Sequence, residues 1–328
     1  MKRFALYFLL FAAILVVADR VLARVCDYLY SRTLTGQTGG KLNHYLSLEP
    51  RPTLVVMGNS RAYYQVIPDS FGVPTYNLCH AGMSQVFQTG LLDVLAQQER
   101  LPKAVLLHLD PYDYTSATEA ITDIQNLKYY FRTNPTVARY TREISVYEPY
   151  KYWLDLYRYN GRIISLAKNY LQTRRTPADR LGNGYDRIAP TPLDSLNTIY
   201  SARKDPQEAK VRFHYDRLRH LDAFLEICRR RNVRVVAFTS PVFEPAASVS
   251  RACQTLDSVL NARQVPYIDY VNQPLPLLQR RLTYWKDNRH LNELGAKVQS
   301  HDLARRVQPW LGAAPTATIP PYAALRAE

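Results

Sequence analysis

The chain has 328 residues, of which 47% are hydrophobic and 21% are charged. This composition is typical of a globular protein and excludes a wholly disordered chain, a collagen-like fibre and a disulfide-rich scaffold. The sequence shows no repeat of about 20–50 residues, which argues against a solenoid or a propeller. Its formal net charge of +14 suits nucleic acid, an acidic polymer or anionic lipid as a partner, although a solvated basic surface without any partner explains the charge equally well.

Residues 1–25 are interpreted as a signal anchor, a transmembrane segment. An uncharged run, FALYFLLFAAILVV at positions 4–17, follows Lys2 and Arg3, and this order is typical of an export signal. We expect the anchor to stay uncleaved and the basic N-terminus to remain in the cytoplasm. Cleavage after Ala18 and a buried helix of a cytosolic protein are the alternatives. The main domain then lies outside the cytoplasm, in the periplasm or beyond, which argues against nucleic acid as a partner.

Beyond residues 26–50, which we interpret as a tether, short apolar runs alternate with helical patterns. Apolar runs bounded by turn residues predict five buried parallel strands, at 53–57, 75–79, 104–109, 233–238 and 267–270. Apolar residues at helical spacing predict helices at 84–98, 208–231, 249–263 and 291–308. This alternation predicts an α/β fold over residues 51–312, a three-layer α/β/α sandwich with a central parallel sheet. The Ala- and Pro-rich tail at 313–328 is expected to be disordered.

Residues from about 115 to 205 break the alternation and predict a helical insert. Nine tyrosines fall between Tyr129 and Tyr170. Basic residues accompany them: Lys128, Lys151, Lys168, Arg174, Arg175, Arg180 and Arg187. We expect the insert to cover the carboxyl ends of the strands, where ligands bind in open α/β folds. Aromatic faces and positive charge suit an anionic glycan, whereas packing tyrosines on a solvated helical cap explain the same composition.

The sequence predicts neither a metal site nor a cofactor. Its four cysteines, Cys26, Cys79, Cys228 and Cys253, show no C-x-x-C spacing, and no nucleotide-binding glycine pattern is present. Cys228 and Cys253 are candidates for a disulfide in an oxidising compartment, but each lies on an apolar stripe, where a buried free thiol is the commoner case. His214 and His220 are six residues apart on a predicted helix, which is poor spacing for a shared metal.

Ser60 is the first candidate catalytic residue. It follows the predicted strand at 53–57 in the segment VVMGNSRA, where Gly58 permits a sharp turn into a helix. A serine at such a turn exposes its hydroxyl, and its own N–H can face a developing oxyanion. Glycine and serine at this spacing are common in loops, so this signal is weak by itself.

Asp287 and His290 form the second candidate group, in the segment KDNRHLNELGA directly before the last predicted helix. Side chains three residues apart at a helix entrance can meet, so the carboxylate can orient the imidazole, which then takes the proton of a serine hydroxyl. Taken singly, Asp287 is equally explained as a helix N-cap and His290 as a surface histidine.

The two segments together resemble the GDSL/SGNH hydrolase superfamily, which has a Gly-Asp-Ser motif after its first strand and an Asp-x-x-His motif near its C-terminus. Gly58-Asn59-Ser60 and Asp287-x-x-His290-Leu291-Asn292 match both motifs in order. The resemblance implies an SGNH/flavodoxin-like fold with Ser60, His290 and Asp287 as the catalytic set and Gly58, Asn59 and Asn292 in support. The segment YNLCHAG at 76–82 is similar to the family's second block, which implies that Gly82 joins Ser60 in the oxyanion hole.

The third block of the family departs from its pattern here. The family has Gly-x-Asn-Asp after its third strand, whereas this chain has LHLDPYDY, with Asp110 and Asp113 but no Asn. Tyr112 or a residue of the insert is a candidate substitute for the missing oxyanion donor. The two aspartates fit paired carboxylates and a loop N-terminus equally well, and His80 fits a polar packing residue better than a catalytic one.

This departure resembles a membrane-anchored branch of the superfamily that is associated with O-acylation of cell-envelope polymers. The resemblance implies a membrane-anchored serine esterase or O-acyltransferase acting on acyl esters, acetyl esters above all, of an envelope or exported polysaccharide. It also implies a membrane-bound acyl-transfer protein as a partner. The alternative is a weakly active or inactive SGNH-fold protein that binds polysaccharide or scaffolds an acylation complex.

Overall fold

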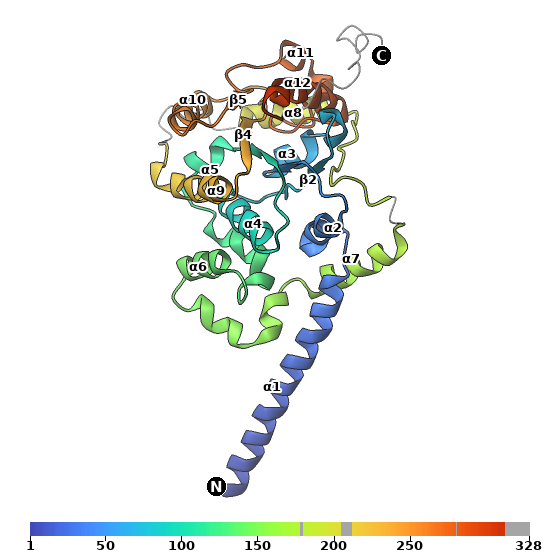
Figure 1. The fold of residues 1–328 in the computed structure, drawn as a ribbon, viewed down its shortest axis with the longest axis vertical. Helices are drawn as coiled ribbons and strands as arrows, with labels where there is room; N and C mark the ends of the chain where they lie inside the picture. Colours follow the sequence, from blue (N-terminus) through green and yellow to red (C-terminus); the bar gives the residue numbers. More distant parts are fainter. Residues whose placement is uncertain (178–179, 205–211, 280, 312–328) are drawn as a thin grey trace.

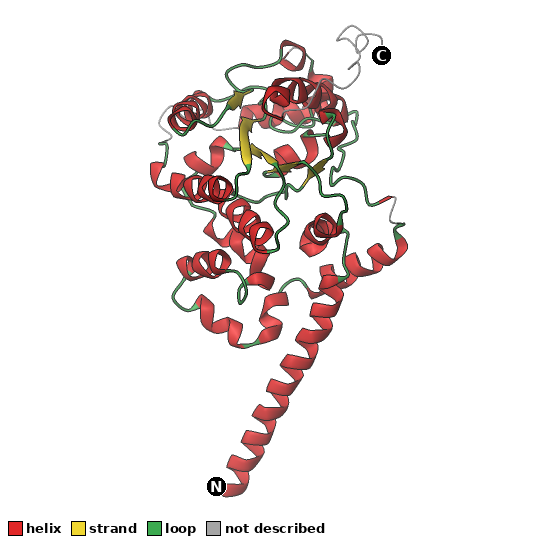
Figure 2. Ribbon diagram, viewed as in Figure 1, coloured by secondary structure: helices red, strands yellow, loops and turns green. Residues whose placement is uncertain are grey.

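The computed structural model describes residues 1–177, 180–204, 212–279 and 281–311. Five strands form its sheet: β1 (Leu54–Met57), β2 (Thr75–Asn77), β3 (Ala104–His108), β4 (Arg234–Thr239) and β5 (Tyr267–Asp269). Their order is β2-β1-β3-β4-β5, and every neighbouring pair is parallel. Helices flank this sheet (Figure 2), which confirms the predicted α/β class. Each predicted strand position is occupied by one of these strands.

Side chains of the sheet alternate between two hydrophobic clusters, as the pleat of a strand requires. In β1, Val55 and Met57 face one cluster, whereas Leu54 and Val56 face the other. The first cluster is covered by α4 (Gln85–Gln97), α9 (Leu218–Arg230) and α10 (Ala247–Ala262). The second is covered by α3 (Ser60–Gln65) and α12 (Glu293–Leu311). These layers form the predicted three-layer sandwich, so residues on both faces bury the sheet.

The predicted helix at 208–231 is shorter in the structure, and its first residues lie outside the described part. Helix α9 begins at Leu218, after one turn of 3-10 helix, η7 (Tyr215–Arg217). Before that turn, the Phe213 ring stacks on Tyr114 with centroids 5.4 Å apart, and the His214 N–H donates to the Tyr114 carbonyl at 2.8 Å. These tertiary contacts hold the chain out of the helix, although its apolar spacing predicted one.

The N-terminal helix α1 (Lys2–Ser31) projects from the body of the molecule (Figure 1). After it come η1, a π-helical turn (Gly36–Gly40), and α2 (Lys41–Ser47). In the segment interpreted above as a tether, Leu42 and Tyr45 are buried in the first cluster. The Lys41 ammonium donates to the Cys79 carbonyl at 2.8 Å. This part of the segment therefore packs onto the sandwich, because apolar residues three apart on α2 share one face.

The insert consists of short helices: η3 (Ile121–Tyr130), α6 (Pro135–Ile144), η4 (Glu148–Trp153), η5 (Asp155–Tyr159), α7 (Ile163–Arg175) and α8 (Asp194–Lys204). Within the insert, η5 and α7 pack against the upper part of α1 (Figure 1), whereas α8 contacts η8 (Leu282–Tyr284) close to the Asp287 loop. The expectation that the insert covers the carboxyl ends of the strands therefore holds only for its last part. Four of its tyrosines are buried by packing: Tyr130, Tyr140, Tyr152 and Tyr159.

Short helical segments complete the described chain: η2 (Pro68–Phe71), α5 (Pro111–Thr115) and α11 (Pro276–Gln279). All four cysteines are buried free thiols, and Cys228 and Cys253 belong to different hydrophobic clusters. The disulfide alternative therefore does not apply to this structure. The predicted disordered tail at 313–328 lies outside the described residues.

Candidate active site

Gly58 turns the chain sharply from β1 into α3, which brings Ser60 to the carboxyl edge of the sheet. Its φ is +155°, and a Cβ built on it would lie 2.6 Å from the Cβ of His108 at the end of β3. Only glycine therefore fits where these two strands end. Asn59 caps the new helix, because its side-chain oxygen accepts from the Arg61 N–H at 3.0 Å. Ser60 is the first residue of the helix and is partly exposed.

A continuous line of hydrogen bonds joins Ser60, His290 and Asp287. The Ser60 Oγ lies 3.0 Å from the His290 Nε2, and the His290 Nδ1 lies 3.1 and 3.0 Å from the two carboxylate oxygens of Asp287. The side chains of His290 and Asp287 are 26% and 34% exposed, so a solute can reach them. The structure thus brings together three residues that are up to 230 positions apart in the sequence.

The loop that carries Asp287 and His290 is fixed by its own backbone. The Asp287 Oδ1 accepts from the N–H groups of Arg289 and His290 at 2.8 and 2.9 Å. Asn292 is fully buried and begins α12, since its oxygen accepts from the Leu294 N–H at 3.1 Å. Gln65 of α3 donates to the Arg289 carbonyl at 3.0 Å, which ties this loop to the helix of Ser60. Asn292 rather than Asp287 is the N-cap of the last helix.

Contacts in this loop favour the ionised form of Asp287. Burial alone would raise the pKa of Asp287, but the hydrogen bond from His290, the charge of a protonated His290 ring and the two backbone N–H groups outweigh burial and lower it. An ionised carboxylate at the Nδ1 of His290 leaves the Nε2 facing Ser60 as the acceptor. This is the tautomer that a general base at Ser60 requires.

Arg61 and Asp110 support the turn at Ser60 from the buried side, and Arg61 was not among the functional residues predicted from the sequence. The Asn59 amide donates to the Asp110 carboxylate at 2.5 Å, and the Arg61 guanidinium lies 3.6 Å from it. Arg61 is 2% exposed and also donates to the carbonyls of Ser240 and Pro241 at the end of β4. Burial opposes ionisation of Asp110, but the charge of Arg61 keeps its pKa below the usual range. The sequence did contain one signal for this role of Arg61, because a charged residue directly follows Ser60 on a helix that enters the core.

Gly82 lies in a loop that is fastened to the Ser60 turn. The His80 N–H donates to the Gly58 carbonyl at 3.0 Å, and Gly82 has a φ of +73°, which favours glycine. Within the described residues, neither the Ser60 N–H nor the Gly82 N–H donates to another backbone group. His80 itself is buried against Phe87, and burial lowers its pKa to about 3, so the packing interpretation of His80 holds.

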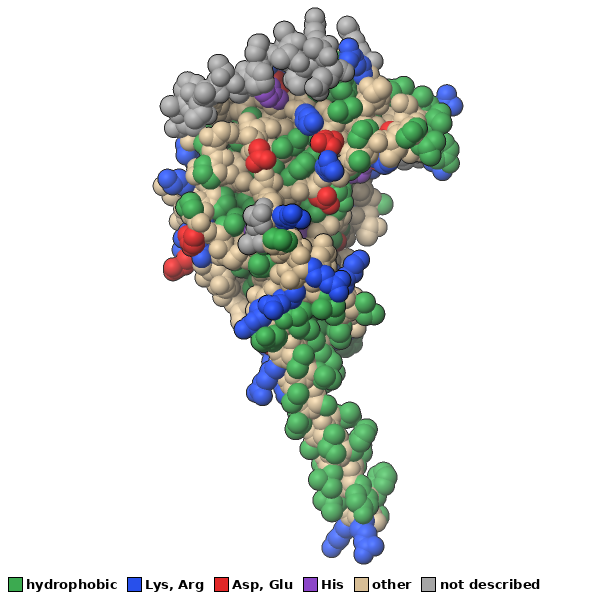
Figure 3. Space-filling view, turned by 90° about the vertical axis from the view of Figure 1, so that its right-hand side faces the viewer, with side chains coloured by type: hydrophobic (Ala, Val, Ile, Leu, Met, Phe, Trp, Pro, Cys, Tyr) green, Lys and Arg blue, Asp and Glu red, His purple; other side chains and the backbone are tan. Residues whose placement is uncertain are grey.

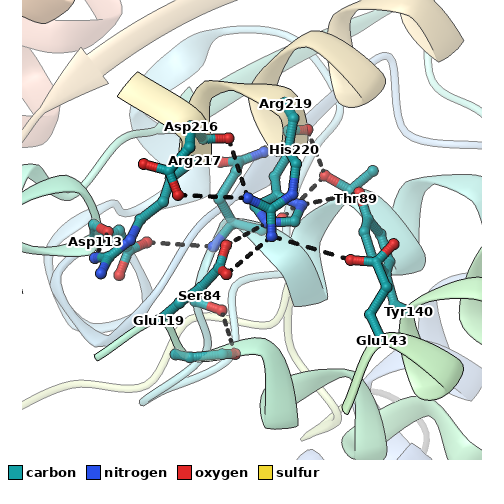
Figure 4. A network of polar contacts seen from close by, with 12 residues as sticks. Ser84, Thr89, Asp113, Glu119, Tyr140, Glu143, Asp216, Arg217, Arg219 and His220 are labelled. Carbon is teal, nitrogen blue, oxygen red and sulfur yellow. Dashed lines mark hydrogen bonds and ion pairs between the residues drawn. The ribbon is translucent and has the colours of Figure 1, made fainter. Parts of the chain in front are cut away.

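Asp113 belongs to a different polar network from Asp110 (Figure 4). Its carboxylate accepts from the Gln85 N–H at 3.2 Å, while Arg217 donates to the Asp113 carbonyl at 2.7 Å. Burial and the charge of Asp110 raise the pKa of Asp113 well above its usual range. In the same network, the His220 Nε2 lies 2.6 Å from the Glu119 carboxylate. This network fixes the loops that follow β2 and β3, and it contributes no group to the hydrogen bonds that join Ser60, His290 and Asp287.

A hollow of about 220 Å³ lies between the end of α7, the loop 180–186 and α3, and Ser60, Asp287 and His290 are not among the residues that line it. Tyr63, one turn after Ser60, lines it together with Lys41 and Arg180. Tyr64 on the same helix packs edge-on to the His290 ring, with centroids 6.5 Å apart. Among the residues that the structure describes, no group of three or more His, Cys, Asp or Glu side chains is placed to hold a metal ion.

Comparison with protein-family models finds no match for this chain, and neither does comparison with curated proteins. Solved structures that resemble it include a "putative acylhydrolase" from Bacteroides fragilis NCTC 9343, with a TM-score of 0.40 and 13% identity over 83% of this chain and 94% of that one. A second is a family two carbohydrate esterase from Clostridium thermocellum in complex with cellohexaose, with a TM-score of 0.35 and 9% identity over 80% of this chain and 66% of that one. At TM-scores below 0.5, neither likeness assigns an activity to this chain.

Proposed function

We propose that this protein is a serine esterase or O-acyltransferase of the SGNH type that acts on acyl esters of a cell-envelope or exported polysaccharide. The observation that carries this proposal is the unbroken line from the Ser60 Oγ through both nitrogens of His290 to Asp287. The three residue types in this order form a nucleophile, a general base and the group that orients the base.

In the proposed reaction, the Ser60 Oγ attacks the ester carbonyl while the His290 Nε2 takes the hydroxyl proton. Asp287 stabilises the imidazolium that forms, and the N–H groups of Ser60 and Gly82 donate to the oxyanion. His290 then protonates the leaving alkoxide, which leaves an acyl group on Ser60. Water or a sugar hydroxyl, deprotonated by His290, attacks this acyl-enzyme and releases Ser60.

One feature favours the second candidate, a protein that binds polysaccharide without efficient catalysis. The segment after β3 has no Asn, and Asp110 at that place holds Asn59 and Arg61 instead. Removal of one oxyanion donor typically lowers the rate by about 10²–10³-fold. A slow enzyme and a binding protein are therefore the two outcomes that an assay must separate.

The test is an aryl-ester assay on the purified full chain in detergent, combined with a serine-directed fluorophosphonate. The proposal expects turnover, loss of turnover on labelling, and a label that is found on Ser60. The Ser60→Ala variant is the control and takes no label. Absence of both turnover and labelling in a folded protein supports the binding protein instead. Adding sugar acceptors to the same assay distinguishes transfer from hydrolysis.

We propose further that α1 anchors the protein in the cytoplasmic membrane, with the sandwich outside the cytoplasm. Among the described residues, α1 is the one helix long and apolar enough to cross a membrane, and all of its residues 4–17 except Ala12 are exposed. A reporter that works only after export, fused after residue 50, should be active. Activity of a cytoplasm-only reporter at that position contradicts this topology. A membrane-bound acyl-transfer protein is the partner expected for the transferase form of the proposal.

A further inference from the structure

The apolar run of α1 is shorter than a membrane. Residues 4–17 contain no charge, and fourteen residues of helix rise about 21 Å, whereas the hydrocarbon core is about 30 Å thick. A span of about 20 residues that starts at Phe4 reaches Ala23. Asp19 and Arg20 then lie inside the end of that span, within about 6 Å of the boundary between hydrocarbon and headgroups, where an uncompensated charge is unfavourable.

The insert compensates both of these charges. The Asp19 carboxylate accepts from the N–H groups of Asp155 and Leu156 at 2.8 and 3.0 Å. The Arg20 guanidinium lies 2.6 Å from the Asp155 carboxylate and donates to the Trp153 carbonyl at 3.0 Å. The segment that joins η4 to η5 is thereby held at the height of Asp19 along α1. If α1 crosses the bilayer, this segment of the insert must lie at the bilayer surface.

This part of the insert has exposed apolar side chains on its free surface. Trp153 is 74% exposed although it is among the largest apolar residues of the chain, and its neighbours behave alike: Val146, Tyr147, Tyr150 and Leu154. Tryptophan and tyrosine concentrate at the interface between a membrane and water. A soluble surface rarely gathers so many exposed large apolar residues within nine positions.

Helix α7 continues this surface on the other side of α1. Its face toward α1 packs Leu166 against Cys26 and Tyr30. Its free face has apolar side chains at helical spacing, Ile163, Ile164, Ala167 and Leu171, bordered by Lys168 and Arg175. An apolar stripe with basic flanks is typical of helices that lie on anionic lipid surfaces. In Figure 3, apolar side chains cover the projecting helix, and basic side chains gather where it meets the body.

From this arrangement we propose that residues 146–154 and the free face of α7 form a membrane platform, which docks on the outer-leaflet surface of the bilayer that α1 crosses. This proposal rests on the proposed anchoring, and it assigns the middle of the insert, residues 146–154 and α7, to lipid rather than to substrate. The platform fixes the height and orientation of the sandwich above the bilayer. The sheet edge that carries Ser60 is thus held at a set distance from the membrane, instead of moving freely on a tether.

The test uses Trp153 as a depth probe in the full chain, reconstituted in nanodiscs that contain spin-labelled lipids. A Trp310→Phe background leaves Trp153 and the buried Trp285 as the only tryptophans of the sequence. We expect lipids labelled at the headgroup or at carbon 5 to quench the Trp153 emission at least twofold more than lipids labelled at carbon 12. Iodide in the aqueous phase should quench it several-fold less than in the denatured chain.

A matched control separates docking from simple proximity to lipid. Tyr215 is 62% exposed and lies on η7, away from α1, so the Trp153→Phe/Tyr215→Trp variant should respond to iodide but not to labelled lipid. A Leu10→Cys variant with a fluorophore reports insertion of α1, because all native cysteines are buried. Carbon-12 labels should quench this fluorophore.

Any outcome other than this quenching pattern contradicts the proposed membrane platform. If the fluorophore at position 10 is quenched but Trp153 is open to iodide and insensitive to lipid labels, the anchor stands and the platform fails. If Trp153 is shielded from iodide and from lipid labels alike, protein rather than lipid covers the surface. If position 10 is not quenched, α1 does not insert, and both the anchoring and the platform are rejected.

Discussion

The sheet edge that carries Ser60 and the proposed membrane platform differ in where they place polar and apolar side chains. At the edge, polar groups such as Asn59, Asp110 and Arg61 are drawn inward and bonded to one another beneath Ser60. On the platform, apolar groups such as Trp153 and Ile164 stay outside, with 74% and 88% of their surfaces exposed. Buried polar groups and exposed apolar patches are the two departures from normal burial that carry information about function. Most polar groups of the edge are paired within the protein, although the Nε and Nη1 of Arg61 make no hydrogen bond among the described residues. The proposed platform, in contrast, requires an external partner to cover its apolar side chains.

The largest expected effect comes from breaking the Ser60–His290 line. Ser60→Ala and His290→Ala should each lower kcat for an aryl ester by about 10³–10⁶-fold, because nucleophile and base act in one proton transfer. For the same reason the double variant should be little slower than either single variant. Steady-state kinetics on all three proteins checks this, and losses that multiply would contradict a shared role. A substitution on the platform, Ile164→Ser, should leave the same kcat unchanged in detergent.

A second way to compare the regions is to add one methyl group to a glycine in each. In Gly58→Ala the new Cβ meets the Cβ of His108 at 2.6 Å, so β1 or β3 must shift and displace Ser60. We expect a loss of about 2–4 kcal/mol in the free energy of unfolding and a loss of most activity. Gly161→Ala in the insert has a similarly unusual φ of +75° but no atom within 4 Å. It should cost about 1 kcal/mol and leave activity intact. Urea unfolding and the ester assay measure both effects, and equal losses would contradict the close-packing argument for Gly58.

His108 predicts a smaller effect that depends on pH. Burial, together with the charge of Arg61, lowers the pKa of His108 from 6.5 to about 3. Below about pH 6.5, His108 therefore binds a proton in the unfolded chain but stays neutral in the folded chain. The stability that neutral, buried His108 contributes is complete above pH 6.5 and is lost progressively as the pH falls toward 3, with a loss on the order of 1 kcal/mol for each pH unit below 6.5.

The measurement is the urea midpoint of unfolding between pH 7 and pH 4.5. His108→Leu keeps a similar volume beside Phe238 and removes the titrating ring. The variant should lower the slope of the free energy of unfolding against pH by the equivalent of about one proton. His80, which has a similarly lowered pKa, contributes to this slope in both proteins. An unchanged slope would mean that folding does not lower the pKa of His108.

The sequence allowed prediction of the strands and of the three residues, Ser60, His290 and Asp287, that the structure brings into one hydrogen-bonded line, because both follow local rules. Buried parallel strands are short apolar runs, and the Gly58–Ser60 turn and the Asp287–His290 spacing are each determined within a few residues. The role of Arg61 was not predictable in this way, since its partners Asp110, Ser240 and Pro241 come from three other segments. The position of the insert was missed for the same reason. Its contacts with Asp19 and Arg20 span more than 130 positions, and no periodicity reports such a distance.

The smallest expected effect concerns the basic end of α7. Arg174 and Arg175 are exposed at the end of a helix that packs on α1, whereas Arg180 lines the hollow beside Tyr63. If residues 146–154 and α7 dock on the membrane, Arg174→Glu/Arg175→Glu should change aryl-ester hydrolysis and transfer to an anionic glycan by less than about twofold in detergent. Arg180→Glu should lower transfer to that glycan without altering aryl-ester hydrolysis, and the loss should shrink at high salt.

The matched control for the first variant is Arg229→Glu/Arg230→Glu, an exposed arginine pair at the end of α9. It makes the same change of charge at the same place in a helix, where loss of cations from a helix C-terminus costs about 0.3–1 kcal/mol each. Activity assays alongside thermal unfolding therefore separate a general effect of charge from a local one. A salt-sensitive loss of transfer that is confined to the α7 pair would assign that end of the insert to the glycan acceptor. It would restrict the membrane platform to residues 146–154 and the first turns of α7.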